Sequence, residues 1–355
     1  MEPGVYKLLI CLDYSLCDGF KDPPRDWFIK GNAQGKFQKD GLLGTLDEYL
    51  KQPFKKGSHL KINVPQAKMN MTLADKIRQE PCPYACNHLW DGFGRWTNDT
   101  WQPYLDELYN WSLPASKYRR SGTLWVYGDS LGVRLFGSLN SRDLCKKLFL
   151  KCRNSYNWLY PLTNEALSRK QNDDLDFMPE KVLEGIRSVL GRPEMQLQDS
   201  VLLLNLGLHY PISVNFTAYQ WVMVDVINIL KETEVNSQGK QVPKYKAKVI
   251  WKSTTAICKH KERKLNGTNS RFMTTQRVLL FSAFAMSAMC QAGFDVIDVY
   301  PLTDSYPGGT LEGDVVHYPN KVFVTMETLL EKYKAHNNQR LVTSEGKERF
   351  RRCTS

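Results

Sequence analysis

Leu124-Trp125-Val126-Tyr127-Gly128-Asp129-Ser130 is the stretch of sequence from which the fold can be read. Four apolar residues form a short strand, Gly128 ends it, and a helical spacing of apolar residues follows over 133–149. A buried strand that leads directly into a helix is typical of a parallel sheet with crossover helices. Ser130 then stands at the carboxyl edge of that sheet, which is where open parallel sheets bind their ligands.

The same alternation continues toward the end of the chain. Strands are predicted at 156–162, 201–208, 248–253 and 294–300, and helices at 179–190, 215–233, 274–292 and 322–334. We therefore predict an α/β fold: a three-layer α/β/α sandwich with a mostly parallel sheet of about five strands, preceded by an irregular N-terminal extension. The expected divisions are the extension over 1–81, the main domain over 82–337 and a basic C-terminal tail over 338–355.

Two short motifs suggest the chemistry. Asp314 and His317 lie in a glycine-rich loop after the last predicted strand, and a spacing of three residues puts them on one side of a single turn. The Asp314 carboxylate can then orient the imidazole of His317, which can take the proton of the Ser130 hydroxyl. Each motif alone is common, because Asp and Ser also cap helices. Their joint position, after the first and last strands of one sheet, predicts a serine nucleophile with a His–Asp base.

A third polar cluster follows the middle strand, in the run Asn205-Leu206-Gly207-Leu208-His209. The Asn205 amide could donate to an oxyanion beside the backbone N–H of Ser130, or it could be a satisfied loop amide. Gly207 permits a close approach of the backbone. His209 could contact the substrate or cap the loop. We predict an oxyanion hole formed by Ser130 and Asn205, with Gly207 and His209 as candidate substrate-binding residues.

These motifs resemble the SGNH, or GDSL-type, hydrolase superfamily: Gly-Asp-Ser-Leu at 128–131, Asn-x-Gly with a nearby His at 205–209, and Asp-x-x-His at 314–317. Within it the chain is most similar to the PC-esterase branch, which includes trichome-birefringence-type polysaccharide O-acetyltransferases, sialic-acid O-acetyltransferases and neurexophilin-and-PC-esterase-domain proteins. Residues 86–104, CNHLWDGFGRWTNDTWQPY, resemble the segment before the Gly-Asp-Ser block in plant members. The resemblance covers roughly residues 82–334.

The resemblance also implies further site residues and shows departures. Many PC-esterases have an arginine three residues after the nucleophile, but here Val133 stands there and Arg134 follows. The run at 249–254 resembles a family strand that ends in a basic residue, here Lys252. Arg134 and Lys252 are therefore candidate substrate-binding residues. Typical SGNH hydrolases take an oxyanion donor from a glycine after the second strand, whereas no glycine occurs between Gly137 and Gly185.

The activity that the resemblance implies is acyl transfer on O-acyl groups of glycans, chiefly O-acetyl groups, through an acyl-enzyme on Ser130. A sugar hydroxyl as second reactant makes the enzyme an O-acetyltransferase, and water makes it a carboxylic-ester hydrolase. A further alternative, from another class, is a non-catalytic glycan-binding protein with this fold. No bound cofactor and no metal are expected. A transferase would use an acyl donor such as acetyl-CoA.

The composition bears on partners. The formal net charge of +11 suits an acidic partner such as a sialylated or sulfated glycan. The basic stretches at 240–264 and 347–352 lack the aromatic interleaving of a nucleic-acid platform, so no nucleic-acid partner is expected. No run reaches the roughly 18 apolar residues of a membrane span, and residues 1–20 lack a basic signal-peptide start. A membrane anchor is therefore expected only in a longer form of the chain.

Sequons and cysteines favour the secretory pathway, in the Golgi lumen or outside the cell. Nine cysteines include the close pairs Cys11/Cys17, Cys82/Cys86 and Cys145/Cys152. None has the spacing of a zinc site, so we predict disulfides. The odd count leaves one over, and Cys290, within an apolar helix, is expected to be the unpaired residue. Five Asn-x-Ser/Thr sequons offer glycosylation sites at Asn70, Asn98, Asn110, Asn215 and Asn266.

Overall fold

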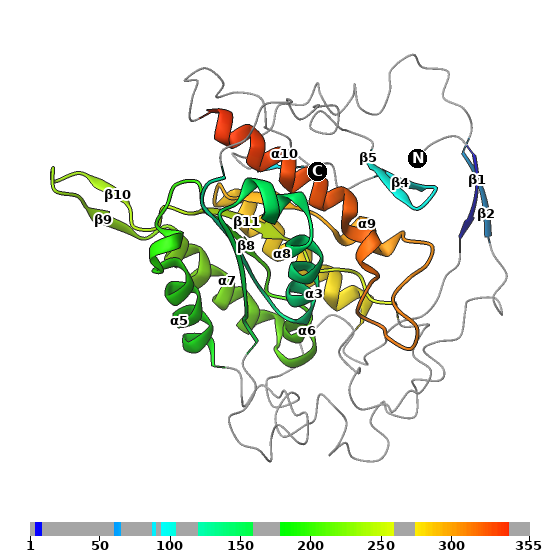
Figure 1. Ribbon diagram of the computed structural model, residues 1–355. Coiled ribbons are helices and arrows are strands. Elements are labelled where there is room, and N and C mark those ends of the chain that lie inside the picture. The colour runs from blue at the N-terminus through cyan, green and yellow to red at the C-terminus, as the bar shows by residue number, and fades with distance from the viewer. Residues whose placement is uncertain are drawn as a thin grey trace.

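The computed structural model describes residues 4–8, 60–64, 87–89, 94–103, 120–158, 178–258 and 274–340. In these ranges a six-stranded parallel sheet carries helices on both faces (Figure 1), which confirms the predicted α/β sandwich. Its spatial order is β3-β12-β11-β8-β6-β7, where β3 is a two-residue strand at one edge. The strands are Asn87–His88 (β3), Thr123–Gly128 (β6), Lys151–Tyr156 (β7), Val201–Leu204 (β8), Lys248–Lys252 (β11) and Asp295–Ile297 (β12).

The order of the strands reverses at β6. After β6 the chain forms β7 on one side of it, and then returns to form β8 on the other side. In open parallel sheets, ligands bind at the carboxyl edge where the strand order reverses. Ser130 follows β6 and Asn205 follows β8, so the sheet topology places these two residues at the carboxyl ends of neighbouring strands.

Alternating side chains of the strands feed two separate cores. On one face Leu124 and Val126 of β6 pack with residues of the helices Ser130–Asn140 (α3) and Val324–Arg340 (α10). On the other face Trp125 and Tyr127 pack with the helices Pro179–Leu190 (α5), Phe216–Leu230 (α7) and Thr275–Gln291 (α8). Every residue of β6 is buried, which explains why a central parallel strand reads as a continuous apolar run.

Some predicted boundaries are wrong. The helix expected over 133–149 is two elements, α3 and the π-helical turn Leu144–Leu148 (η4). The strand expected at 156–162 lies at 151–156, because β7 is an edge strand whose half-exposed sequence carries no apolar run. The strand expected over 201–208 ends at Leu204, and the short helix His209–Ser213 (α6) follows. The hairpin of Thr233–Val235 (β9) and Gln241–Pro243 (β10), absent from the prediction, projects from the body (Figure 1).

Apart from β3 and the adjoining Leu89, the described parts before residue 120 are strand pairs. Gly4–Leu8 (β1) pairs antiparallel with Leu60–Val64 (β2), so these ten residues depart from the irregular extension that we predicted. Gly94–Thr97 (β4) and Thr100–Pro103 (β5) form a hairpin whose Trp101 is buried against the α3–α10 core. Its two-residue turn, Asn98-Asp99, has positive φ at both positions, as such hairpins require. The short helices Pro193–Met195 (η6), Tyr300–Asp304 (α9) and Asn320–Phe323 (η8) complete the described elements.

No helix in the described ranges is long and apolar enough to cross a bilayer.

The cysteines fit the disulfide prediction in one pair and contradict it at one residue. Cys145 and Cys152 are bonded and tie η4 to β7. Cys290 is also disulfide-bonded, so the expectation that it is the unpaired cysteine is wrong. It stands in the last turn of α8. Cys258 keeps a buried thiol. The other cysteines that are close in sequence, Cys11/Cys17 and Cys82/Cys86, and the sequons at Asn70, Asn110 and Asn266 lie outside the described residues.

Candidate active site

The structure brings Ser130, His317 and Asp314 together at the carboxyl edge of the sheet. The Ser130 Oγ lies 3.0 Å from His317 Nε2. The other ring nitrogen, Nδ1, lies 2.7 Å from Asp314 Oδ2. Ser130 is the first residue of α3, so its N–H belongs to the turn whose amides have no acceptor within the helix. This is the arrangement in which a carboxylate orients an imidazole and the imidazole takes a proton from a hydroxyl.

The Asp314 carboxylate is held by its own loop. Its second oxygen, Oδ1, accepts hydrogen bonds from the backbone N–H groups of Val316 and His317, at 2.8 and 3.0 Å. Partial burial raises the pKa of Asp314, but these amides and the His317 ring outweigh it and hold the pKa below its ordinary value. The loop is fixed to its neighbours by the Cys258 N–H, which donates to the Val315 carbonyl at 2.8 Å. Asp314 is therefore ionised and ready to orient the imidazole.

Asp129 shapes the turn that presents the nucleophile. Its buried carboxylate caps α3 by accepting from the Leu131 N–H at 3.0 Å, and it also accepts from the Leu208 N–H at 2.8 Å. A Cβ on Gly207 would lie 1.9 Å from the same carboxylate. Gly207 therefore makes room for Asp129, which differs from the substrate-binding role that we predicted for it. The strand-end loops of β6 and β8 share one carboxylate.

Asn205 does not have the geometry of the predicted oxyanion donor. Its side-chain amide donates to the Lys252 carbonyl at 2.8 Å and to the Thr254 hydroxyl at 3.2 Å, so both of its hydrogens are engaged. These bonds link the end of β8 to the end of β11. The prediction went wrong because a sequence shows that an amide follows a strand, and not which neighbour it meets.

Two other predicted substrate-binding residues differ in exposure. Lys252 is only 2% exposed, and its ammonium donates to the Ser253 carbonyl at 2.9 Å. It cannot contact a substrate in this conformation, because the strand end encloses it. Arg134 is exposed on α3, one turn after Ser130. Its substrate-binding role stays a prediction.

His209 lies where the prediction expected a residue of the site. Its Nε2 is 3.0 Å from the Tyr156 hydroxyl, and its ring stacks on Trp158 with 5.0 Å between the ring centroids. Tyr156 ends β7 and His209 follows β8, while β6 lies between these strands. The hydrogen bond therefore passes over the carboxyl end of β6, beside the nucleophile turn. Burial lowers the pKa of His209, and the charge of His317 lowers it further against the opposing effect of Asp129.

Tyr156 and Trp158 were missed by the sequence analysis. The available signal was the aromatic run Tyr156-Asn157-Trp158, which we placed inside a strand instead of just after one. Asn157 likewise supports the site, since its amide donates to the Asn205 carbonyl.

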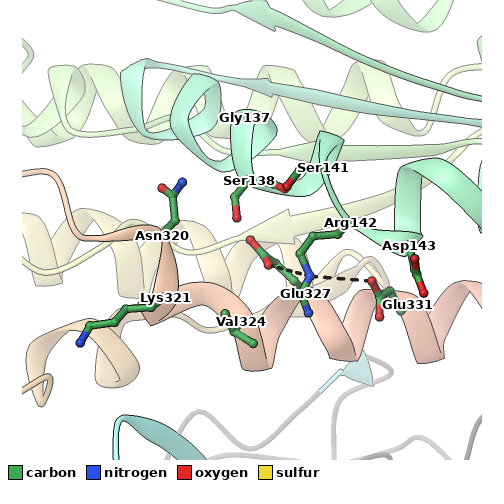
Figure 2. A pocket seen from close by; sticks show the side chains of 10 residues that line it. All are labelled: Gly137, Ser138, Ser141, Arg142, Asp143, Asn320, Lys321, Val324, Glu327 and Glu331. Carbon is green, nitrogen blue, oxygen red and sulfur yellow. Dashed lines mark hydrogen bonds and ion pairs between the residues drawn. The ribbon is translucent and has the colours of Figure 1, made fainter.

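A hollow lies away from Ser130, between the end of α3 and the start of α10 (Figure 2). It has a volume of about 630 Å³. Arg142 reaches into it and lies 3.1 Å from Glu327, whose side chain is fully buried. Glu331 lies next to the same guanidinium and accepts from the Leu144 N–H at 3.2 Å. Burial raises the pKa of both carboxyls despite the arginine. These contacts join α10 to α3 and η4, and they identify a structural ion-pair cluster.

Comparisons with known proteins give a likeness in shape only. No family model matches the chain, and no curated protein matches it. Similar solved structures include a lipase/acylhydrolase from Enterococcus faecalis, with 13% identity over 61% of this chain and 97% of that one and a TM-score of 0.38. A carbohydrate acetylesterase from Sinorhizobium meliloti has 13% identity over 63% and 100%, with a TM-score of 0.36. The periplasmic domain of a lipopolysaccharide acetyltransferase from Salmonella ser. Paratyphi A has 11% identity over 62% and 84%, with a TM-score of 0.32. These values are too low to assign a function.

Proposed function

We propose that this chain is a serine acyl-transfer enzyme of the SGNH type that acts on O-acyl groups, chiefly O-acetyl groups, of glycans. The observation that carries the proposal is the continuous Asp314–His317–Ser130 relay, with contacts of 2.7 and 3.0 Å. The place of Ser130 at the reversal of strand order supports it, because that is where an open α/β sheet binds its ligand. The glycan as substrate and the relation to PC-esterases rest on the resemblance of the sequence motifs.

The proposed reaction has two halves. In the first, Ser130 Oγ attacks the acyl carbonyl while His317 Nε2 takes its proton, and Asp314 stabilises the imidazolium that forms. The Ser130 N–H, at the start of α3, faces the developing oxyanion. The leaving group takes the proton from His317, and an acyl-enzyme ester remains on Ser130. In the second half, His317 accepts the proton of the incoming hydroxyl, which attacks the ester carbonyl. The bond from the acyl carbon to Ser130 Oγ then breaks, and His317 returns the proton to that oxygen.

The second reactant decides between the two outcomes of the proposed chemistry. A sugar hydroxyl makes the protein a glycan O-acyltransferase that uses a donor such as acetyl-CoA, and water makes it an ester hydrolase. The basic net charge supports an acidic glycan as acceptor. The Cys145–Cys152 disulfide supports a site of action in the secretory pathway or outside the cell.

A serine-directed fluorophosphonate tests the nucleophile without knowledge of the substrate. We expect the parent protein to be labelled covalently on Ser130 and Ser130→Ala not to be labelled. The exposed serine of α8, in Ser287→Ala, is a matched control and should leave labelling unchanged. Equal labelling of Ser130→Ala and the parent would refute the assignment. The parent protein is then incubated, without the probe, with radiolabelled acetyl-CoA and a sialylated glycan. Radioactivity on the glycan indicates transfer, and radioactive free acetate indicates hydrolysis.

A further inference from the structure

Asn205 is joined by hydrogen bonds to the ends of three other strands. It is the first residue after β8 and is only 2% exposed. Its N–H donates to the Tyr127 carbonyl of β6 at 3.1 Å, and its own carbonyl accepts from the amide of Asn157, just after β7. Its side-chain amide donates to the Lys252 carbonyl of β11 at 2.8 Å. One residue therefore links β6, β7 and β11 at the edge of the sheet that carries Ser130.

The orientation of the Asn205 side chain follows from its partners. The Lys252 carbonyl can only accept a hydrogen bond, so the amide atom that faces it must be the nitrogen. The same nitrogen also donates to the Thr254 hydroxyl, at 3.2 Å. The backbone pairing of β8 with β11 ends at Leu204 and Trp251. Beyond that point the Asn205 side chain continues the connection between the two strands.

The connecting segment, residues 253–258, leads from Asn205 to the loop that bears the base. All six of its residues are buried. Its N–H groups donate to β12, α8 and α9 in turn: Ser253 to the Ile297 carbonyl at 2.9 Å, Thr254 to the Ser282 hydroxyl at 3.2 Å and Ala256 to the Thr303 hydroxyl at 2.9 Å. At its end the Cys258 N–H donates to the Val315 carbonyl at 2.8 Å. The connecting segment therefore holds the base loop, residues 305–319, which contains Asp314 and His317.

These contacts form a closed circuit around the proposed catalytic pair. From Ser130 the circuit passes to His317 at 3.0 Å and along the base loop to Val315. It continues through the connecting segment to Asn205, whose N–H returns it to β6, the strand that leads into Ser130. Leu131 and Val315 also pack in one apolar cluster. The position of His317 relative to Ser130 therefore depends on the contacts that Asn205 makes.

We propose that Asn205 is a positioning residue for the Ser130–His317 pair, because its side-chain amide holds the connecting segment, and through it the base loop, at a fixed place relative to the end of β6. This inference rests on the proposed acyl-transfer function. Asn205 acts through the base loop and not on the reacting atoms. Its backbone N–H and both hydrogens of its amide are already engaged, so it has none to donate to an oxyanion.

The rate of fluorophosphonate labelling of the full chain tests the inference at Thr254, whose hydroxyl accepts from Asn205. Thr254→Val keeps the shape of the side chain and removes the hydroxyl. We expect labelling about two- to tenfold slower, the rate change that corresponds to one hydrogen bond. Thr254→Ser keeps the hydroxyl, loses a methyl group and should keep most of the parent rate. A role in packing alone would give the opposite order, because Thr254 is buried and the lost methyl group would leave a cavity.

A double-mutant cycle separates positioning from oxyanion binding. Asn205→Ala leaves the Lys252 carbonyl without its donor and should be labelled about 10- to 100-fold more slowly, as small misplacements of reacting groups cost. Adding Thr254→Val should then slow labelling no further, because the hydroxyl has already lost its amide partner. An oxyanion donor would act independently of Thr254, and the two effects would multiply.

Ser200→Ala is the matched control. The buried Ser200 hydroxyl accepts from the Thr123 N–H at 2.9 Å, and so joins the beginnings of β6 and β8 at the opposite edge of the sheet. The control should lose stability in urea and still be labelled at the parent rate. If Asn205→Ala does not fold, the two Thr254 variants decide alone.

The positioning role is overturned if Thr254→Val is labelled like the parent or faster than Thr254→Ser. Effects of Asn205→Ala and Thr254→Val that multiply, or a Ser200→Ala protein that is slowed as much as Asn205→Ala, would overturn it as well. Absence of labelling in the parent would instead refute the proposed function, so the two failures are distinguishable.

Discussion

Asp314 holds His317 at two points, the ring and the backbone. Its Oδ2 meets the ring Nδ1 at 2.7 Å, and its Oδ1 accepts from the His317 N–H at 3.0 Å. One carboxylate thus sets both the direction of the imidazole and the conformation of the turn that bears it. The remaining ring nitrogen lies 3.0 Å from Ser130 Oγ, so a loop far along the chain brings an imidazole to the hydroxyl that follows β6.

Asp314→Asn should therefore slow the labelling of Ser130 more than the loss of one negative charge alone would. An amide can place N–H groups where the carboxylate now accepts from the ring and from the backbone, which favours the wrong tautomer of His317. We expect fluorophosphonate labelling of Ser130 to fall by about 10³- to 10⁴-fold, as in other serine triads. The exposed Glu312→Gln in the same loop is the charge-matched control. Labelling of Asp314→Asn within tenfold of the parent would contradict the relay.

Gly207→Ala should destabilise the loop that follows β8 and its contact with the Asp129 carboxylate. The new methyl group would lie 1.9 Å from the Asp129 carboxylate, so the loop must move and the Leu208 hydrogen bond must lengthen or break. We expect a loss of about 1–3 kcal/mol in the free energy of unfolding, the usual cost of overpacking, and slower labelling of Ser130. Denaturation by urea measures the first effect.

Gly137→Ala provides the matched control for that substitution. Gly137 lies in α3, and a Cβ there meets no other atom within 4 Å. Alanine is the better helix former by about 1 kcal/mol. The control should be neutral or stabilising, and a similar loss in both variants would show that the Asp129 contact is not the cause.

His209 should stay uncharged for the site to work. Its pKa lies below that of free histidine, chiefly because it is buried. A permanent positive charge at this position would oppose the imidazolium that forms on His317 during attack. We expect His209→Lys to slow labelling at pH 7 by about fivefold or more, which corresponds to a repulsion on the order of 1 kcal/mol. His209→Gln, polar and neutral, should be slowed less. The reverse order would contradict this electrostatic account.

Glu327 should make the stability of the protein depend on pH. Burial raises its pKa in the folded protein above that of the unfolded chain. Its contribution to stability is then complete below the unfolded pKa, about 4.5, and is lost as the pH rises through the raised value. Glu327→Gln cannot titrate, so its free energy of unfolding should differ less between pH 5.0 and pH 7.5 than that of the parent. The parent should lose more stability over this interval than the variant does.

Urea titrations at the two pH values measure this difference. Glu180→Gln, at an exposed position of α5, is the control and should keep the pH dependence of the parent. If Glu327→Gln and the parent lose the same stability between pH 5.0 and pH 7.5, the carboxyl does not carry the raised pKa.

The central strands and the turn that joins Asp314 to His317 could be predicted because each depends on local sequence. β6 and β8 are buried on both faces and read as apolar runs, and Asp314 and His317 belong to one turn. β7 was displaced because an edge strand need not be apolar. Asn205 was misassigned because the partners of its amide, the Lys252 carbonyl and the Thr254 hydroxyl, come from the end of another strand. Such pairings follow from the strand order, which one sequence does not display.

The β9–β10 hairpin has a practical consequence for work with this protein. It joins the end of α7 to the start of β11, and so lies at the amino edge of the sheet, opposite Ser130. Its turn is held locally, by the Asn236 side chain that accepts from the N–H groups of Gln238 and Lys240. Exposed turns of this kind tolerate inserted sequence. A biotin-acceptor peptide placed between Gln238 and Gly239 would fix the molecule to a surface with the Ser130 edge of the sheet facing the solution.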